Sequence, residues 1–393
     1  MPAVQEHVLL TVTGRDHPGI VARIMGLLSE TGSQVLDLEQ VVIQGQLTLC
    51  VVVRLPESRG VLKELLFAAK ELGLELDFKP AEAPFATTAP ATRYVVTAIA
   101  RVLGARELHA VASCLAAHAC NIEKVTRLSQ GDLGSVEIRV TLPASADPER
   151  LKRALLQLAM SGTFDVAMQR ESLYRRSKRL VVMDMDSTLI RIEVIDELAR
   201  AHGVVEQVSA ITERAMQGEM DYDESLRQRV ALLEGLPLSV LEKLAADLPL
   251  TEGAETLIRV LKRLGYRTAV ISGGFAVAAE ALKARLGIDY AYANGLESRD
   301  GKLTGRTVGP IVNAERKAEL LERIAAEEGI LLDQVIAVGD GANDLLMLER
   351  AGLGIAFRAK AKLRAAADTS ISAGGLDSIL YLLGLTASET QEA

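Results

Sequence analysis

An apolar segment that stops abruptly at two carboxylates constrains the fold of this chain more than any other feature. Residues 179–183, Arg-Leu-Val-Val-Met, are rich in aliphatic side chains, and Asp184, Asp186 and Thr188 follow at once. A buried strand of a parallel sheet has this composition, and open α/β sheets bind ligands beyond the carboxyl ends of their strands. Because Asp and Ser also end strands by favouring turns, the segment alone leaves both a turn and a catalytic pair open.

Two later segments repeat this pattern of a strand followed by polar residues. Residues 267–271 end at Ser272 and Gly273, where a hydroxyl and a flexible backbone let amides approach an anion. Residues 335–338 form a third apolar run, and Lys317 lies between the two near the start of a helical pattern. The polar residues after the third run are Asp340, Asn343 and Asp344. Each segment alone is typical of a turn or a solvated helix. The prediction of one site therefore depends on all the segments occurring together in this order.

The order of these segments resembles that of the haloacid dehalogenase phosphatase superfamily, over about residues 178–393. The resemblance depends on four motifs: Asp184-x-Asp186-x-Thr188, Ser272, Lys317, and Gly339-Asp340-x-x-Asn343-Asp344. It implies an α/β fold, a doubly wound parallel sheet of the Rossmann type with a helical cap. It also implies hydrolysis of phosphate monoesters through an aspartyl-phosphate on Asp184, with Asp186 as general acid and base.

The charge of the acidic motifs predicts a metal ion. A phosphomonoester is anionic, and the acids that would repel it at contact distance are Asp184, Asp186, Asp340 and Asp344. A divalent cation removes this repulsion, and an all-oxygen ligand set selects Mg²⁺. The resemblance implies ligands from the side chains of Asp184 and Asp340 and from the backbone carbonyl of Asp186, while Asp344 would orient bound water.

The other motif residues are expected around the phosphate group. By the same resemblance, Ser272, the amide of Gly273 and Lys317 would stabilise charge on the phosphoryl oxygens. Asn343 is expected to contact the substrate. Thr188 is expected to contact the metal ligands without binding the metal ion itself.

A long insertion between the first two motifs predicts the part of the protein that selects the substrate. Residues 193–250 contain four helical patterns, which predict a compact cap that excludes water from the site. The predicted helices cover 193–202, 205–216, 222–233 and 238–248. Met216 and Tyr222 either line this cap or pack inside it.

Two charged residues of the cap, Glu193 and Arg229, are candidates for substrate recognition. On an ordinary helix both would be solvated. Their spacing from Asp184 is similar to that of an acid and an arginine in phosphoserine phosphatases. This resemblance implies that Glu193 pairs with the ammonium of phosphoserine and Arg229 with its carboxylate, which the planar fork of arginine can bond twice.

The first 175 residues contain one succession of patterns twice, 87 positions apart, so that Leu55-Pro56 matches Leu142-Pro143. Each copy has a strand, a helix, two strands and a further helix. In the first copy they cover 7–13, 20–31, 35–43, 47–55 and 61–72, and in the second 94–100, 107–119, 122–128, 136–142 and 150–161. The succession predicts two α+β ferredoxin-like βαββαβ units, each with a four-stranded antiparallel sheet.

The loop at 14–20 of the first copy, Gly-Arg-Asp-His-Pro-Gly-Ile, resembles that of the ACT domain. The resemblance implies an amino-acid effector against this loop, with Gly19 exposing amides at a helix N-terminus. The second copy lacks the aspartate and the proline, and its glycine is displaced, although Gly104 could still serve as the corresponding effector residue. L-serine is the expected effector, and a dimerisation scaffold without an effector is the alternative. Free sheet edges predict a homodimer through these domains.

A chain of 393 residues is too long for one core and suits two or three domains. We expect ACT-like domains over 1–84 and 91–172, joined by a proline-rich linker, and a phosphatase domain over 178–393 with its cap at about 193–250. A basic cluster at 175–179 falls at the second junction and is typical of a solvated hinge. The net charge of −8 and the lack of interleaved aromatics argue against nucleic acid as a partner.

The cysteines and the hydropathy predict a cytoplasmic protein. Cys50, Cys114 and Cys120 have no metal-binding spacing, which favours free thiols in a reducing compartment. The N-terminus lacks the basic and apolar regions of a signal peptide. Without a run of about 18 apolar residues, the sequence predicts no membrane span.

Together these resemblances imply a Mg²⁺-dependent enzyme that hydrolyses O-phospho-L-serine to L-serine and phosphate, the last step of serine biosynthesis, with feedback by serine at the ACT domains. Two alternatives stay open. An enzyme of the same kind could pass the phosphoryl group from Asp184 to another alcohol such as homoserine, since acceptor choice depends on the cap. A regulatory amino-acid-binding protein with an inactive hydrolase domain would conflict with the intact catalytic motifs.

Overall fold

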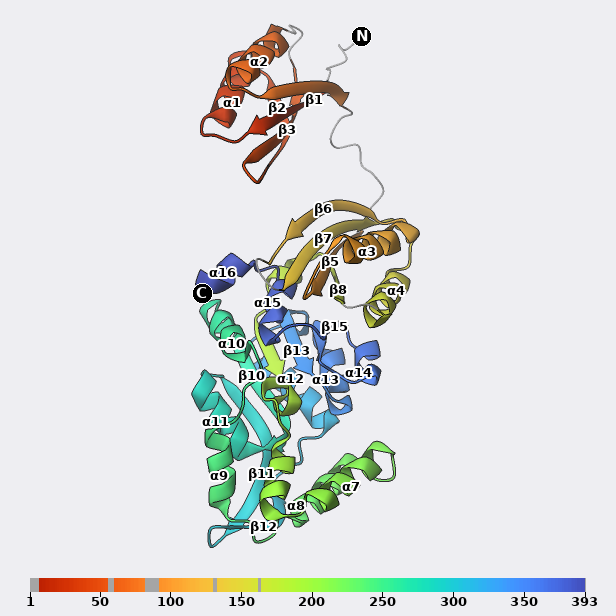
Figure 1. Ribbon diagram of the computed structural model, residues 1–393, viewed down its shortest axis with the longest axis vertical. Helices are drawn as coiled ribbons and strands as arrows, with labels where there is room; N and C mark the ends of the chain where they lie inside the picture. Colours follow the sequence, from red (N-terminus) through yellow and green to blue (C-terminus); the bar gives the residue numbers. More distant parts are fainter. Residues whose placement is uncertain (1–6, 56–59, 82–91, 130–132, 162–163, 393) are drawn as a thin grey trace. The chain divides into compact units, whose positions relative to one another are not determined.

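The structure, a computed structural model, describes residues 7–55, 60–81, 92–129, 133–161 and 164–392 (Figure 1). The chain divides into two compact units, 1–90 and 91–393. Most of the proline-rich linker predicted between the repeats lies outside the described residues.

The first repeat folds as predicted, into an antiparallel sheet with two helices. Its elements are β1 (His7–Arg15), α1 (Ile20–Glu30), β2 (Gln34–Ile43), β3 (Gln46–Arg54), α2 (Gly60–Glu71) and β4 (Glu75–Ala81), and the strand order is β2-β3-β1-β4. Alternate residues of β1, Val8, Leu10 and Val12, are buried in a core shared with Ile24 of α1 and Leu65 of α2. One face of the sheet therefore carries the core of this unit.

The second repeat has the same topology in a different environment. Its elements are β5 (Thr92–Ala100), α3 (Ala105–Ala117), β6 (Asn121–Arg127), β7 (Gly134–Leu142), α4 (Pro148–Ser161) and β8 (Phe164–Arg170). In the described part of the chain, these strands continue through β15 (Thr369–Ile371) into an 11-stranded sheet, where Thr369 pairs with Ala167 of β8. The expectation of a separate four-stranded sheet therefore needs correction for this copy.

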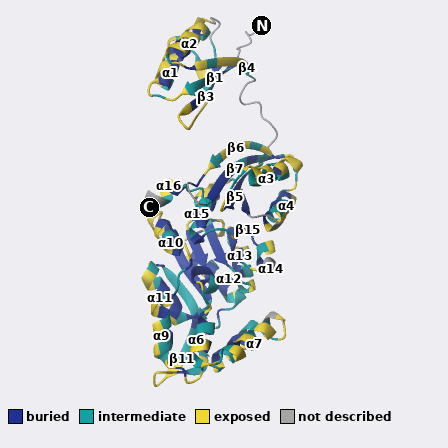
Figure 2. Ribbon diagram, viewed as in Figure 1, coloured by how far each residue is buried: buried dark blue, intermediate teal, exposed yellow. Residues whose placement is uncertain are grey.

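Burial along β5 explains why the two repeats differ. Residues 95–100 are all buried, whereas buried and half-buried residues alternate along β1. Val96 packs on the helices of its own repeat, while Ile99 packs with Ile371 and Leu380 of the hydrolase domain. Strands covered on both faces have continuous apolar runs. Strands β5, β7 and β8 are thus largely buried, as the dark colour of β5 illustrates (Figure 2), whereas the edge strand β6 is mostly exposed.

The basic cluster at 175–179 is not the solvated hinge that the sequence suggests. Arg175, in the short helix α5 (Leu173–Arg176), is buried, and its Nη2 lies 2.6 Å from Oε2 of Glu137 in β7. Lys178 is also buried, and its Nζ donates to the backbone oxygen of Asp333. These basic side chains are fixed contacts that join the second repeat to the hydrolase domain.

Replacing Arg175 with Ala is expected to destabilise the protein by about 3 kcal/mol, because Glu137 would stay buried without its main partner. Arg139, whose Nε lies 3.9 Å from Oε1 of Glu137, limits the loss. Urea titration measures the free energy of unfolding. Arg176→Ala, at an exposed position of the same helix, is the matched control and should change stability by less than about 0.5 kcal/mol. Equal effects of both substitutions would contradict the prediction.

The hydrolase domain continues the sheet in the order β12-β11-β10-β9-β13-β14-β15. Its strands are β9 (Leu180–Met183), β10 (Arg267–Phe275), β11 (Tyr290–Arg299), β12 (Lys302–Val308), β13 (Val335–Gly339), β14 (Leu353–Phe357) and β15. Neighbours from β11 to β15 are parallel, and β12 pairs antiparallel with β11. The doubly wound parallel sheet that the sequence predicts is therefore confirmed.

Two separate cores lie on the two faces of this sheet. Val181 and Met183 of β9 belong to one core, and Leu180 and Val182 belong to the other. The first face is covered by α10 (Ala254–Arg263) and α11 (Ala276–Leu286), and the second by α12 (Ala314–Glu327), α13 (Leu345–Arg350) and α14 (Ala361–Ala366). The last helices of the chain are α15 (Ile379–Leu382) and α16 (Ala387–Glu392).

The insertion after β9 forms the predicted helical cap. Its helices are α6 (Val194–His202), α7 (Val205–Met216), α8 (Tyr222–Ala231) and α9 (Leu238–Ala246). The chain enters and leaves the cap side by side, since Ile190 pairs with Leu250. At the far end the cap rests on the hairpin of β11 and β12, where Gly235 N donates to Leu303 O.

The cysteine thiols are free: Cys120 is buried, and Cys50 and Cys114 are half-buried. Within the ranges that the structure describes, we find no helix with both the length and the apolar character needed to span a bilayer.

Candidate active site

The first motif forms a tight turn at the end of β9, in the middle of the sheet. The amide of Asp184 donates to Val338 O in the neighbouring strand β13. Ser187 adopts φ 58°, a left-handed conformation that few residues other than glycine take. The turn brings the hydroxyl of Thr188 to 3.1 Å from Oδ1 of Asp340, to which it donates. Two motifs therefore meet at the carboxyl ends of β9 and β13, where α/β sheets bind ligands.

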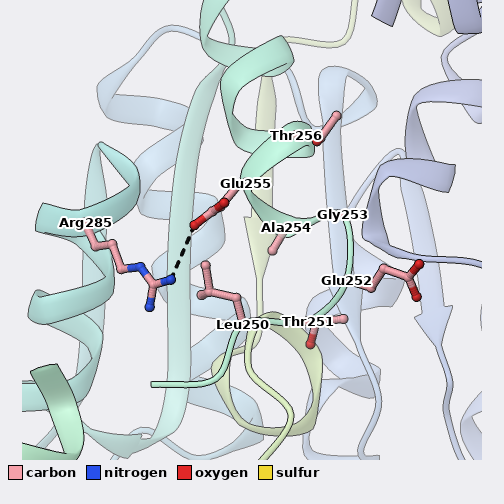
Figure 3. A pocket seen from close by; sticks show the side chains of 8 residues that line it. All are labelled: Leu250, Thr251, Glu252, Gly253, Ala254, Glu255, Thr256 and Arg285. Carbon is pink, nitrogen blue, oxygen red and sulfur yellow. Dashed lines mark hydrogen bonds and ion pairs between the residues drawn. The ribbon is translucent and has the colours of Figure 1, made fainter. Parts of the chain in front are cut away.

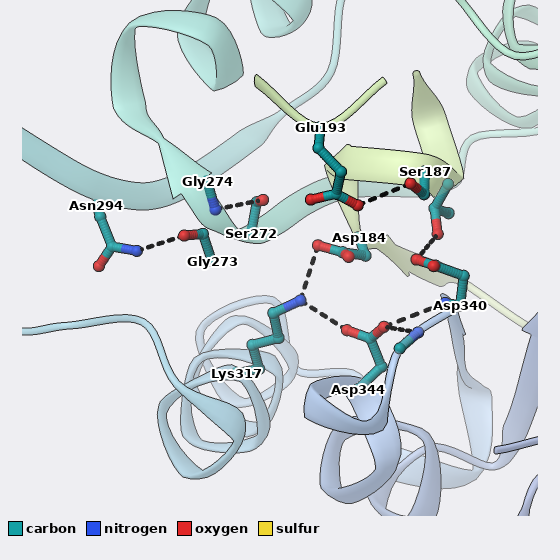
Figure 4. Close-up of polar contacts among 12 residues, drawn as sticks. Asp184, Ser187, Glu193, Ser272, Gly273, Gly274, Asn294, Lys317, Asp340 and Asp344 are labelled. Atoms are coloured by element: carbon teal, nitrogen blue, oxygen red, sulfur yellow. Dashed lines mark hydrogen bonds and ion pairs between the residues drawn. The ribbon is translucent and has the colours of Figure 1, made fainter. Parts of the chain in front are cut away.

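Lys317 joins the acidic side chains into one network (Figure 4). It comes from α12, its exposed fraction is 0%, and its Nζ lies 2.7 Å from Asp184 Oδ1 and 2.6 Å from Asp344 Oδ1. Burial lowers the pKa of Lys317, but the charges of Asp184 and Asp344 outweigh burial and hold the pKa above its ordinary value. The ammonium therefore stays charged and offsets part of the buried negative charge.

The remaining negative charge helps to raise the pKa values of the carboxyl groups. Burial, followed by the charge of Asp344, raises the pKa of Asp184 to about 7. The same two causes raise the pKa of Asp340 to about 6. Oxygens of Asp184, Asp340 and Asp344 all lie within 4.8 Å of one another. Such a cluster of hard oxygen donors, destabilised by mutual repulsion, fits a bound Mg²⁺.

The hydrogen bonds of Asp344 distinguish it from the other two acids. Its Oδ1 accepts from Lys317, and its Oδ2 accepts the amides of Asp340 at 3.1 Å and Gly341 at 3.0 Å. These bonds hold the loop after β13 in place. Asp184 and Asp340 are therefore the better placed to direct side-chain oxygens at a metal ion.

Asp186 lies on the side of the site that faces the cap. Its Oδ1 accepts the amide of Val194 at the start of α6, at 3.2 Å. A Cβ on Gly274 would lie 2.4 Å from its Oδ2, so any larger residue there would displace the carboxyl group. Burial first, and then the charges of Glu193 and Asp184, raise the pKa of Asp186 well above its ordinary value. The protonated form is thus favoured, as a general acid requires.

The second motif forms the end of β10. Ser272 is buried, and its Oγ accepts the amide of Gly274 at 2.9 Å. The carbonyl of Gly273 accepts from the hydroxyl of Tyr222 at 3.1 Å and from Nδ2 of Asn294 at 2.7 Å. A Cβ on Gly273 would lie 2.1 Å from that hydroxyl and would displace the tyrosine. Glycine at this position lets the cap approach the strand end.

The cap residues expected to recognise the substrate both lie close to these groups. Glu193 begins the cap, and its Oε1 accepts the hydroxyl of Ser187 at 2.7 Å. Arg229, in α8, is half-buried, and its Nε donates to Ser225 O at 3.3 Å. The charge of Glu193 acts on the pKa of Asp186, and the charge of Arg229 acts on that of Tyr222.

The other predicted site residues lie in loops. Asn343 is half-buried in the turn Ala342–Asp344 that follows Asp340. Gly19 adopts φ 99° before α1, and no atom of the described residues lies within 4 Å of where its Cβ would be. The amide of Gly104 instead donates to Oε2 of Glu107 at 2.9 Å. Glu107 places a carboxylate next to this amide, so Gly104 is less suited than Gly19 to bind a further carboxylate.

A cavity of 310 Å³ lies apart from this cluster, where the cap rejoins the core (Figure 3). Residues 250–256 and Arg285 line it, and none of the motif residues does. Arg285 is held there by Glu255 at 3.3 Å and by Leu248 O at 2.9 Å. The cavity therefore lies beside the segment through which the chain leaves the cap.

Two asparagines that support the site were not predicted. Asn294 is buried, donates to Gly273 and accepts the amide of Val312 at 2.8 Å. Asn313 caps the start of α12, and its Nδ2 lies 3.2 Å from Oδ1 of Asp223 in the cap. In the sequence, Asn294 stands out only as an amide side chain within the largely apolar segment 290–296. An asparagine in such a position is also typical of a turn.

Comparison with protein families confirms both resemblances. Residues 178–352 match the haloacid dehalogenase-like hydrolases, and residues 6–79 and 92–169 each match an ACT domain.

Individual relatives agree over longer stretches. A solved HAD family hydrolase from Salmonella enterica serovar Typhi has a TM-score of 0.65 and 32% identity, and the match covers 74% of this chain and 98% of that one. A structure described as a phospho-aspartyl intermediate analogue of phosphoserine phosphatase has a TM-score of 0.50 and 49% identity, over 52% of this chain and 98% of that one. A phosphoserine phosphatase from Streptomyces coelicolor is 42% identical over 98% of this chain and 94% of that protein. This chain therefore belongs to the phosphoserine phosphatase family of haloacid dehalogenase-like hydrolases.

Proposed function

We propose that this protein hydrolyses O-phospho-L-serine to L-serine and phosphate with Mg²⁺ as cofactor, as the last step of serine biosynthesis. The observation that supports this most is the meeting of acidic, hydroxyl and ammonium groups from the ends of β9, β10 and β13 and from α12. A cap that carries Glu193 and Arg229 covers this meeting point. The name of the Streptomyces relative points to the same substrate.

The side chains of Asp184 and Asp340 and the backbone carbonyl of Asp186 would hold the metal ion. When bound, Mg²⁺ would supply the positive charge that lets an anionic phosphate approach these carboxylates. Lys317 adds a second positive charge beside Asp184, and Ser272 and the amide of Gly273 supply hydrogen-bond donors.

The reaction would proceed in two displacements. A carboxylate oxygen of Asp184 attacks phosphorus and expels the serine oxygen, which takes its proton from Asp186. The aspartyl-phosphate on Asp184 is then hydrolysed by a water molecule whose proton passes to Asp186. The raised pKa of Asp186 suits the first step, and the similar structure described as a phospho-aspartyl intermediate analogue supports the route.

A substrate panel tests this function. Phosphate release from phosphoserine is compared with release from phosphothreonine, a phosphosugar and a phosphopeptide. Phosphoserine is expected to have the highest kcat/KM, excess chelator should abolish release, and added Mg²⁺ should restore it. Full activity in excess chelator, or a clear preference for the phosphosugar, would overturn the proposal.

Replacing Arg229 with Ala is expected to lower kcat/KM for phosphoserine at least about 30-fold, because losing the partner of a desolvated carboxylate costs roughly 2 kcal/mol or more. Para-nitrophenyl phosphate has no carboxylate, so its kcat/KM should change less than about twofold. Arg227→Ala is the matched control, since Arg227 is exposed on the same helix. Equal losses on both substrates would assign Arg229 another role.

Transfer to a second alcohol is the alternative reaction, and the cap contacts do not by themselves favour water over such an acceptor. Phosphate release from phosphoserine, measured with and without homoserine, separates the two. An undiminished rate of phosphate release supports hydrolysis, whereas a fall matched by phosphohomoserine supports transfer.

We also propose that L-serine binds the loop at 14–20 and regulates the enzyme. The open surroundings of Gly19 at the start of the 11-residue helix α1 suit a carboxylate. Isothermal titration of the full chain with L-serine, in an Arg229→Ala background that weakens serine binding at the active site, should give heat that Gly19→Ala removes and Gly104→Ala retains. The absence of heat at millimolar serine would reject this effector.

A homodimer through the ACT domains is proposed from the surface of the first one. Strand β2 lies at a sheet edge and exposes apolar side chains, and an apolar edge favours pairing with another strand. These side chains are Val35, Leu38, Val41, Val42 and Ile43. Sedimentation should show a dimer that Val41→Lys weakens, and a monomer at micromolar concentration would contradict the proposal.

A further inference from the structure

The peptide group between Gly273 and Gly274 is held by three hydrogen bonds. Its N–H donates to Ser272 Oγ at 2.9 Å, and its carbonyl accepts from the hydroxyl of Tyr222 at 3.1 Å and from Nδ2 of Asn294 at 2.7 Å. Asn294 is buried in the core, whereas Tyr222 belongs to the cap. The orientation of this peptide therefore depends on the core and the cap together.

The peptide in turn determines what Ser272 can do. Because Ser272 Oγ accepts the amide of Gly274, one lone pair is used and the hydroxyl hydrogen remains for donation in another direction. A Cβ on Gly274 would meet both Asp186 Oδ2, at 2.4 Å, and Ser272 Oγ, at 3.2 Å. Ser272 is thus oriented beside the general acid, on the side where the phosphate would lie.

Tyr222 links the orientation of this peptide to the position of the cap. It begins α8, and Arg229 lies seven residues later, two turns along the same helix face. Asp223 also contacts the core, since its Oδ1 lies 3.2 Å from Nδ2 of Asn313 at the start of the Lys317 helix. Burial raises the pKa of Tyr222 to about 12, so its hydroxyl remains a donor at neutral pH.

We propose that Tyr222 is a positioning residue that couples closure of the cap to phosphate binding through the Gly273–Gly274 peptide. With the cap closed, the tyrosine hydroxyl fixes the peptide, and the peptide directs the hydroxyl of Ser272 at a phosphoryl oxygen. When α8 moves away, the carbonyl loses one of its two donors and Ser272 loses its fixed orientation. The inference rests on the proposed function to the extent that the ligand of Ser272 is a phosphate ester.

Tyr222→Phe tests the coupling because it keeps the ring and removes the hydroxyl. We expect kcat/KM to fall about tenfold for both phosphoserine and para-nitrophenyl phosphate, the factor that corresponds to one lost hydrogen bond. Competitive inhibition by inorganic phosphate should weaken by a similar factor. Tyr174→Phe, at an exposed position, is the matched control for loss of a hydroxyl. Thermal unfolding of both variants checks that the fold is intact.

A double-mutant cycle with Ser272→Ala separates positioning from a general structural effect. If Tyr222 acts through Ser272, then Tyr222→Phe should cost less than about twofold in the Ser272→Ala background. A full tenfold loss in that background, or no loss in the single variant, would overturn the proposal. A loss confined to phosphoserine would also overturn the proposal, because the effect of Tyr222 would then act through Arg229. The para-nitrophenyl phosphate assay decides the question even if phosphoserine proves not to be the substrate.

Discussion

Replacing Asp184 with Asn is expected to lower kcat by about 10⁴-fold, the scale of loss when a nucleophile is removed from a preorganised site. An amide oxygen is a poor nucleophile, and Asn also replaces a charged oxygen of one of the two side-chain metal ligands that we propose with a neutral one. The effect should be the same for phosphoserine and para-nitrophenyl phosphate, because both present phosphorus to the same atom. Single-turnover measurement of phosphate release gives the rate of the chemical step.

The fold should survive this substitution. Asn has nearly the same volume, and Lys317 keeps its contact with Asp344 at 2.6 Å. Asp333→Asn, at an exposed position, is the matched control and should leave kcat unchanged. Residual activity above about 1% of the wild-type value would assign the nucleophile elsewhere.

Replacing Lys317 with Met is expected to destabilise the protein by about 3–5 kcal/mol, because it leaves two buried carboxylates without their common partner. Asp344 is fully buried and Asp184 is nearly so, so water cannot replace the ammonium. Activity should fall at least about 10²-fold as well, since the phosphoryl group loses a stabilising charge. Chemical unfolding and steady-state kinetics measure the two effects.

The pH dependence of this destabilisation identifies its cause. Without the ammonium, the pKa of Asp184 should rise above its present value of about 7, so the folded state binds more protons than the unfolded chain over the range above 3.8. Stability of the metal-free variant should therefore fall as pH rises through this range. Lys243→Met, which removes an exposed lysine from the cap, is the control and should keep the pH dependence of the unsubstituted protein, in which the contribution of Asp184 ends near pH 7. A pH-independent loss would point to packing instead of charge.

Much of the fold could be predicted because it depends on local patterns. The apolar runs before Asp184, Ser272 and Asp340 specify buried strands, and parallel strands bring their carboxyl ends to one edge of a sheet. The repeat of strand and helix patterns likewise predicts the two ACT domains, which comparison with known families confirms. The structure brings the motif residues together, while their individual roles stay predictions that the substitutions above test.

The chain's own sequence determined the order and type of its elements, the gathering of acids at the strand ends and the position of the cap, because periodicity and turn residues act over a few neighbours. Only the tertiary structure decided that the second repeat joins the hydrolase sheet, that Arg175 is buried against Glu137, and that Tyr222 and Asn294 hold one peptide. Each of these features pairs groups far apart along the chain. Their burial and hydrogen bonds depend on which partner the fold supplies, and no local pattern specifies that partner.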